Sequence, residues 1–161
     1  MNKNKKLILS ILVENYSGTL SKVAGLFTRR GYNIDSLNVA ETQDPNISRI
    51  TVAVTGDSYI IEQITKQLHK LINVIKISIL TEDTSVQLEL MMIKVNAIGT
   101  KRAEIIQIAD IFKANIIDVS SKNMIVAITD SEEKNNNFLE LLKPYGIVEM
   151  TRTGPTALER G

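Results

Sequence analysis

Near its start the chain carries Leu7-Ile-Leu-Ser-Ile-Leu-Val13, an apolar run that leads directly into the polar turn Glu14-Asn-Tyr-Ser-Gly-Thr-Leu20. A short apolar run bounded by a turn is typical of a buried β-strand. After the turn, apolar residues recur at the i, i+3, i+4, i+7 spacing of a helix that buries one face: Leu20, Val23, Ala24 and Phe27. Gly31 is suited to end this helix. This segment therefore predicts a strand, a glycine-bearing turn and an amphipathic helix.

Two further strands, a second helix and a final strand are predicted before residue 81. Residues 34–40 and 49–55 have the pattern of strands joined by the turn Asp44-Pro45-Asn46, and the second strand alternates apolar with polar or small side chains. A helix is predicted to begin at Asp57 or Ser58, with one apolar face: Ile61, Ile64, Leu68 and Leu71. Residues 74–80 supply a fourth strand, so the order of elements is βαββαβ.

The same order returns after a polar break at residues 81–85. Strands are predicted at residues 86–96, 116–120, 124–129 and 147–151. Each intervening helix carries an apolar stripe, the first made of Ile105, Ile108, Ala109 and Phe112 and the second of Phe138, Leu141 and Leu142. The repeat extends to local sequence, because Gly99-Thr100 corresponds to Gly18-Thr19 and Asn115-Ile116 corresponds to Asn33-Ile34.

We therefore expect an α+β protein of two tandem ferredoxin-like (βαββαβ) domains, residues 1–81 and 82–161. Each domain would be a four-stranded antiparallel sheet with its helices on one face, which leaves the other face free to pack against something. Domains of about 80 residues bury a modest fraction of their surface. Pairing with each other or with a second chain is therefore expected.

Composition excludes several classes of function. With 19 Lys and Arg against 18 Asp and Glu, the formal net charge is +1, so the chain lacks the field that collects nucleic acid or an anionic membrane. It has no Cys and one His, His69, which excludes thiolate metal sites and Cys-His catalysis. Lysines before Leu7 resemble the start of a signal peptide, but Glu14 follows the apolar run directly, and the run is too short to span a membrane.

The residues disfavour two other functions of βαββαβ domains, namely an acylphosphatase-like activity and RNA binding. An acylphosphatase-like enzyme needs an anion-binding Arg in the first turn, where this chain has none. An RNA-binding domain needs aromatic side chains on its central strands, but residues 8–13 and 50–54 carry none. We therefore expect no catalytic residue, no metal site and no nucleic-acid partner.

The turn around Gly18 is suited to a small anion, because the first N–H groups of a helix have no partner within the helix and carry partial positive charge. Gly18 allows close approach, and the Asn15 amide can hold the ammonium or the carboxylate end of a ligand. Many strand-to-helix turns carry a Gly for backbone reasons alone. Asn33 is equally readable as a turn residue, and Ile34 as a core residue. The residues alone leave these alternatives open.

One family shares this pattern over nearly the whole chain. The run ENYSGTLSKVAGLFTRRGYNIDSLNV, from Glu14 to Val39, closely resembles the small regulatory subunits of acetolactate synthase (acetohydroxyacid synthase). The resemblance continues through a series of shorter motifs: Asp44-Pro45, Ser48-Arg49, QITKQLHK at residues 63–70, Arg152-Thr-Gly154 and Ala157-Leu158. It implies an N-terminal ACT domain that binds an amino-acid effector and dimerises, and a C-terminal domain that contacts a large catalytic subunit.

The resemblance also implies what this chain does and does not do. It would catalyse nothing alone and hold no cofactor, while the catalytic partner would hold thiamine diphosphate, Mg and FAD. It would raise the activity of that partner and confer feedback inhibition by valine or a related branched-chain amino acid. The compartment would be bacterial cytoplasm or plastid stroma. An ACT-domain amino-acid sensor that regulates a different partner is the alternative.

In this family, effectors bind between the ACT domains of a homodimer. Carried over by position, Asn15 and Gly18 of one subunit would face Asn33 and Ile34 of the other, with Leu20 and Ile34 enclosing the ligand side chain. One methylene changes affinity by only about 1–3 kcal/mol, so the sequence does not separate valine from leucine or isoleucine. The Gly99 turn lacks an equivalent of Asn15, and we predict that it does not bind the amino acid.

Overall fold

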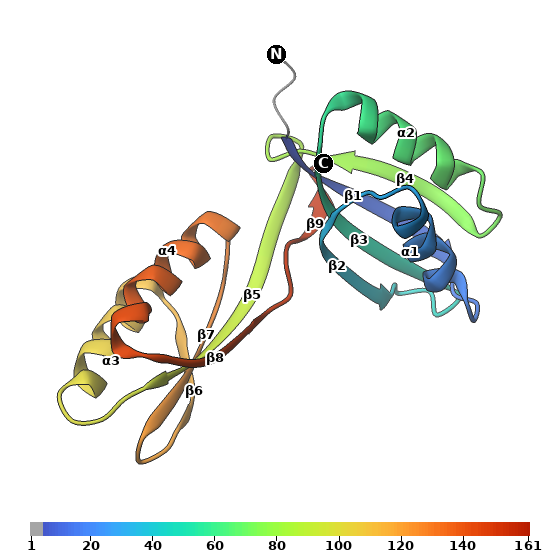
Figure 1. Cartoon of the computed structure of the whole chain (residues 1–161). Coiled ribbons are helices and arrows are strands. Elements are labelled where there is room, and N and C mark those ends of the chain that lie inside the picture. Colours follow the sequence, from blue (N-terminus) through green and yellow to red (C-terminus); the bar gives the residue numbers. More distant parts are fainter. Residues whose placement is uncertain (1–4) are drawn as a thin grey trace. The chain divides into compact units, whose positions relative to one another are not determined.

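The apolar run at the start of the chain forms β1 (Lys5–Glu14), which lies in the centre of the first sheet. The computed structural model describes residues 5–161. In this sheet β1 pairs antiparallel with β3 (Ile47–Gly56) on one side and β4 (Val74–Leu80) on the other. The fourth strand, β2 (Ile34–Glu41), pairs only with β3, so the strand order is β2-β3-β1-β4 (Figure 1). This is the predicted ferredoxin-like order.

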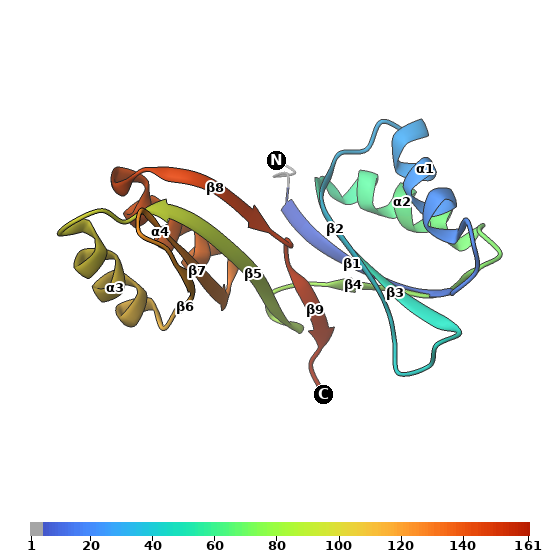
Figure 2. The same ribbon diagram turned by 90° about the horizontal axis from the view of Figure 1, so that it is seen from below.

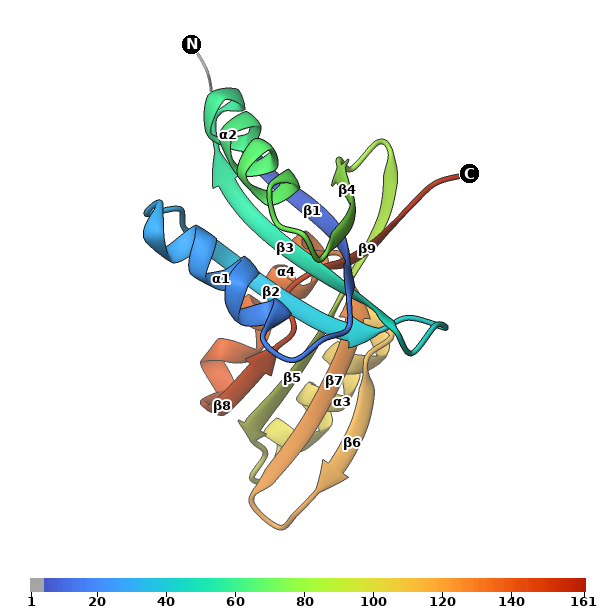
Figure 3. The ribbon, with the colours of Figure 1, turned by 90° about the vertical axis from the view of Figure 1, so that its right-hand side faces the viewer.

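Two helices, α1 (Thr19–Arg29) and α2 (Ser58–His69), cover one face of this sheet (Figure 3). Alternate residues of the central strands point into the space beneath them, because side chains on a strand alternate between the two faces. Asp57 caps α2, its carboxylate accepting a hydrogen bond from the Ile60 N–H at 2.9 Å. The buried core is aliphatic with one aromatic ring: Leu9, Ile11, Val13, Val23, Leu26, Phe27, Ile50, Val52, Val54, Ile61, Ile64 and Leu68.

The second repeat forms the same unit again (Figure 2). Its sheet has the order β6-β7-β5-β8, and its helices pack on a separate core. The repeat includes irregularities, since the β2–β3 and β6–β7 ladders each shift register near the start of their first strand. The element bounds are β5 Ser85–Asn96, α3 Lys101–Phe112, β6 Asn115–Val119, β7 Asn123–Asp130, α4 Glu132–Leu142, a 3-10 turn Lys143–Tyr145 and β8 Ile147–Arg152.

Two positions of the predicted buried stripes are wrong. Leu20, at the start of α1, is 41% exposed. Leu141 is 48% exposed, although Phe138 and Leu142 on the same helix are fully buried. The buried face of α4 instead includes Asn135, which donates from its side-chain amide to the carbonyl oxygen of Glu89 at 2.9 Å. A hydrogen bond to a neighbouring strand therefore lets a polar residue take a core position, and Leu141 lies on the flank of the helix.

A ninth strand was not predicted from the sequence. This strand, β9 (Thr156–Glu159), places Ala157 among Ile8, Ala53 and Leu80 of the first unit, on the face of the sheet opposite its helices. The Arg160 N–H donates to the Thr84 carbonyl oxygen at 2.8 Å. By its contacts the chain divides into one unit of residues 5–86 with 156–161 and another of residues 87–155. The last residues thus lie with the first unit, whereas a boundary at 81/82 was expected.

The start of α1 gives a test of backbone conformation. Gly18 has φ 86°, a left-handed conformation that other L-residues adopt at a cost of about 1–2 kcal/mol, although its surroundings leave room for a Cβ. Gly18→Ala should therefore lower the free energy of unfolding by about 1 kcal/mol. Gly25→Ala, within the same helix and equally unobstructed, should raise it by about 0.5–1 kcal/mol. Chemical denaturation of both variants would check the opposite signs, and equal effects would contradict this account.

Candidate functional site

The Gly18 turn (residues 15–19) leaves two N–H groups exposed at the start of α1. The Thr19 N–H donates to the Tyr16 carbonyl oxygen at 3.2 Å, and the Lys22 N–H donates to the Gly18 carbonyl oxygen at 3.0 Å. Between them, the N–H groups of Leu20 and Ser21 have no partner within residues 5–161, and no side chain caps the helix. These are the unpaired donors that a ligand carboxylate can accept from.

Asn15 has a structural role that the sequence did not indicate. Its side-chain NH₂ donates to Glu41 Oε1 at 3.1 Å and to the Pro45 carbonyl oxygen at 3.0 Å. Its backbone N–H donates to the Asn46 carbonyl oxygen at 2.8 Å. Asn15 therefore ties the Gly18 turn to the turn between β2 and β3. Because the NH₂ group is engaged, only the amide oxygen remains for a ligand, and that oxygen is suited to an ammonium group rather than a carboxylate.

The second repeat makes the corresponding tie with a cation. Arg102, in the first turn of α3, donates to the carbonyl oxygens of Ser120 at 2.6 Å and Ser121 at 3.1 Å, and to that of Ala97 at 3.1 Å. These residues lie at the turn between β6 and β7 and at the end of β5. The guanidinium thus links the same two turns that Asn15 links in the first unit. That the Gly99 turn does not bind an amino acid stays a prediction.

The other predicted residues lie at the far end of the same sheet. Ile34 pairs with Val54, and Leu7 pairs with Val54 from the other side, so Ile34 lies level with the beginning of β1. The Gly18 turn follows the end of β1, at Glu14. Seven residues of strand separate these two levels, which corresponds to roughly 23 Å at about 3.3 Å per residue. The structure therefore does not bring Asn33 and Ile34 together with Asn15 and Gly18 within one chain.

Four of the five predicted site residues are exposed, and the fifth is half-buried. Leu20 is 41% exposed at the start of α1, and Asn15, Gly18 and Asn33 are exposed as well. Ile34 is half-buried and packs against the core beneath the helices. Ile34 is thus a core residue with one exposed side, which leaves part of it available to a ligand.

An edge of the first sheet lies between these two ends. Among the described strands β2 pairs with β3 alone. Leu37 and Val39 are paired with Val52 and Ile50, whose side chains lie beneath the helices. Side chains paired across strands share a face of the sheet. Yet Leu37 is 37% exposed and Val39 is 42% exposed. An unpaired edge with exposed aliphatic side chains is suited to pairing with another chain.

Within residues 5–161 no three His, Asp or Glu side chains lie close enough together to hold a metal ion. His69 is exposed at the end of α2. In the same part of the chain no helix has the length and apolarity needed to cross a membrane. A pocket on the helix-free face of the first sheet was not indicated by the sequence, because its lining comes from four strands distant in sequence.

Comparisons with known proteins cover both units. Residues 88–161 match a family model described as the small subunit of acetolactate synthase. Residues 9–76 match a model described as the AHAS small subunit-like ACT domain.

Individual relatives agree with these two models. The chain is 50% identical over 155 residues to a probable acetolactate synthase small subunit of Methanothermobacter thermautotrophicus, covering 96% of this chain and 92% of that protein. It is 43% identical to the acetolactate synthase small subunit of Haemophilus influenzae, covering 96% and 95%. The crystal structure of the acetolactate synthase small subunit of Thermotoga maritima has a TM-score of 0.90 to this chain at 39% identity, covering 98% of both.

Because these matches span almost the whole chain and include both the repeated βαββαβ unit and the Gly18 turn, this chain belongs to the acetolactate synthase small-subunit family, and its first unit is an ACT domain.

Proposed function

We propose that this chain is a regulatory subunit of acetolactate synthase that binds a branched-chain amino acid between the ACT domains of a homodimer. The observation that supports this most directly is the separation of the predicted site residues. Asn15 and Gly18 lie at one end of the sheet, and Asn33 and Ile34 lie at the other. Two chains related by a twofold axis and placed edge to edge along β2 would set the first end of each against the second end of its partner.

In this arrangement the ligand contacts follow from the groups at each end. The N–H groups of Leu20 and Ser21 would donate to the carboxylate, and the Asn15 amide oxygen would accept from the ammonium. Leu20 and the partner subunit's Ile34 would enclose the aliphatic side chain. Hydrogen bonds to a charged group are worth about 1.5–3 kcal/mol each, and burial of a side chain the size of valine adds about 1.5–3 kcal/mol. These contributions are consistent with micromolar to millimolar binding.

Regulation would then depend on a difference in affinity. A ligand shifts an equilibrium between two arrangements of the paired ACT domains only to the extent that it binds one arrangement more tightly than the other. A ligand held by groups from two chains favours the arrangement in which those groups face each other. The catalytic subunit, which would hold thiamine diphosphate, Mg and FAD, would respond to that arrangement. This chain would supply no catalytic residue.

The proposal is tested by mixing this chain with an acetolactate synthase catalytic subunit. We expect acetolactate formation to rise and to become sensitive to valine. Gly18→Asp should abolish valine inhibition while activation persists, because a fixed carboxylate would stand where the carboxylate of the ligand binds. Gly18→Ala is the matched control, since it carries the same backbone strain without the charge.

Three outcomes of this experiment are informative. Loss of inhibition in Gly18→Asp alone supports the site. An equal loss of valine inhibition in Gly18→Ala would indicate that backbone strain causes the effect. Unchanged valine inhibition in Gly18→Asp would contradict the site. Binding of valine without any rise in turnover would favour an ACT-domain sensor that serves a different partner.

The edge-to-edge pairing along β2 has a separate test. Leu37→Asp places a charge on the exposed aliphatic edge and should shift the chain from dimer to monomer in sedimentation velocity, with loss of valine binding at the Gly18 turn. Ile72→Asp is a matched control, because Ile72 is 95% exposed in the loop before β4 and should leave the dimer intact. A dimer that survives Leu37→Asp would rule out pairing along this edge.

A further inference from the structure

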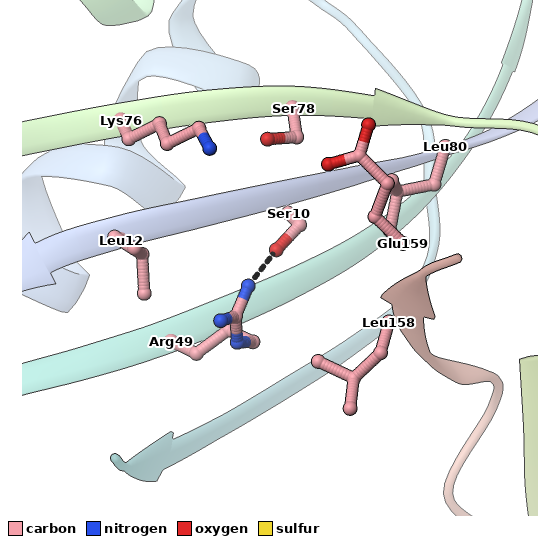
Figure 4. Close-up of a pocket in the computed structure, with 8 residues that line it drawn as sticks. All are labelled: Ser10, Leu12, Arg49, Lys76, Ser78, Leu80, Leu158 and Glu159. Carbon is pink, nitrogen blue, oxygen red and sulfur yellow. Dashed lines mark hydrogen bonds between the residues drawn. The ribbon is translucent and has the colours of Figure 1, made fainter. Parts of the chain in front are cut away.

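The first sheet carries a pocket of about 180 Å³ on its helix-free face (Figure 4). All of its lining residues belong to the first unit. Three strands of the sheet form the floor, and β9 forms one wall. The lining residues are Ser10, Leu12, Arg49, Lys76, Ser78, Leu80, Leu158 and Glu159.

The register of the strands arranges the floor in three rows. Arg49, Leu12 and Lys76 are paired across β3, β1 and β4 and form a row with a cation at each end. Ser10 is paired with Ser78 in the next row, about 6.7 Å further along the strands. Ile8 and Leu80 form the third row, where Ala157 packs. The floor therefore changes from cationic, through hydroxyl-bearing, to aliphatic.

The two cations of the floor have no acidic partner in the part of the chain that the structure describes. Within residues 5–161 no carboxylate lies within ion-pair distance of Arg49 or Lys76. Arg49 donates one hydrogen bond, from Nη1 to Ser10 Oγ at 2.5 Å. Neighbouring strands lie about 4.8 Å apart, so two strand spacings separate Arg49 from Lys76. Side chains of this length can reach one carboxylate placed above Leu12, and an Arg guanidinium is suited to bidentate binding of it.

Ser10 is a buried hydroxyl directed into this pocket. It is only 2% exposed, and it accepts from Arg49. Its own hydrogen is donated to no described residue. A hydroxyl that is held in place by one bond and retains a free donor is suited to bind an oxygen of a ligand. Burial of a polar group is costly unless its hydrogen bonds are made, so a ligand acceptor here would be favourable.

The wall supplied by β9 adds an anion and an aliphatic side chain. Glu159 and Leu158 line the pocket from the side, and Figure 4 shows the Glu159 carboxylate on the side of Ser78 and Leu80, whereas Lys76 and Arg49 lie beyond Ser10. Leu158 and Leu80 offer apolar contact. The pocket thus presents cations at one end, a carboxylate at the other and aliphatic groups beside them.

We propose that this sheet pocket is a second binding site, for a small aliphatic α-amino acid in its zwitterionic form. The carboxylate of the ligand lies against Arg49 and Lys76, its ammonium faces Glu159, and its side chain contacts Leu80 and Leu158. A simple anion is a poorer match, because Glu159 would repel it. The site needs no second chain, since one ACT domain and its own β9 supply every contact.

Binding can be measured on the full-length chain by nuclear magnetic resonance, with Leu37→Asp removing the dimer-dependent site. In this background we expect valine, leucine or isoleucine to shift the amide resonances of Ser10, Ser78 and Leu158. The paired probe is 2-oxo-3-methylbutanoate, which has the skeleton of valine without its ammonium. It should bind at least tenfold more weakly than valine.

Charge-removing variants assign each end of the pocket. Lys76→Gln and Arg49→Gln should each weaken valine binding at least tenfold. Glu159→Gln should weaken valine binding and strengthen binding of the oxo acid. Lys76 and Glu159 are exposed, so these two substitutions test the site even if Arg49→Gln disturbs the sheet. Lys70→Gln, a matched charge loss at the exposed end of α2, should change nothing.

Several results would overturn the sheet pocket. One is the absence of shifts at Ser10 and Ser78 with all three amino acids. Another is an equal loss of binding in Lys70→Gln, which would indicate nonspecific attraction. Tighter binding of the oxo acid than of valine would contradict the role of Glu159. None of these outcomes bears on the dimer-dependent site, because the measurements are made where that site is disrupted.

Discussion

The burial of β1 between β3 and β4 is the constraint on which the other features of the first unit depend. A central strand has both edges paired, so its register fixes what lies on each side and at each end. One set of alternate side chains, including Leu9 and Ile11, packs beneath α1 and α2. The other set, including Ser10, forms the floor of the sheet pocket. The end of β1 places the Gly18 turn, and a slip of one residue would move every one of these groups to the wrong face.

The two repeats share one fold but differ in the chemistry of their turns. Both repeats share strand order, helix placement and the position of a register shift. In the first repeat a neutral amide, Asn15, links the strand-to-helix turn to the neighbouring hairpin, and in the second the guanidinium of Arg102 does so. An amide keeps an acceptor oxygen available next to unpaired helix N–H groups. A guanidinium has donors only and fills the space with a long side chain, so the two turns differ in the ligands that suit them.

The carboxyl-terminal segment follows the second repeat in the sequence, but it packs on the first unit. After the second unit ends, β9 returns to the first unit and buries Ala157 against Ile8 and Leu80. In the second unit, Arg152 precedes this segment and donates to the buried Glu89 carboxylate from Nη2 at 2.6 Å. Charge-assisted hydrogen bonds of this kind are strong when the acceptor is desolvated. The family motif at residues 152–154 thus has a structural function in holding β8 to β5, apart from any contact with a catalytic subunit.

The sequence by itself determined the order of the four strands and two helices in each repeat, the ferredoxin-like fold and the family, because hydrophobic period, caps and turn residues are local signals. It also marked Asn15 and Gly18. Only the tertiary structure decided that Asn33 and Ile34 lie at the opposite end of the sheet from these two residues. It also decided that the Asn15 NH₂ group donates its hydrogen bonds to Glu41 and Pro45. The packing of β9 on the first unit was likewise decided by the tertiary structure. Strand pairing joins residues distant along the chain, and a four-residue strand has too little pattern of its own to be recognised before the surface that buries it is known.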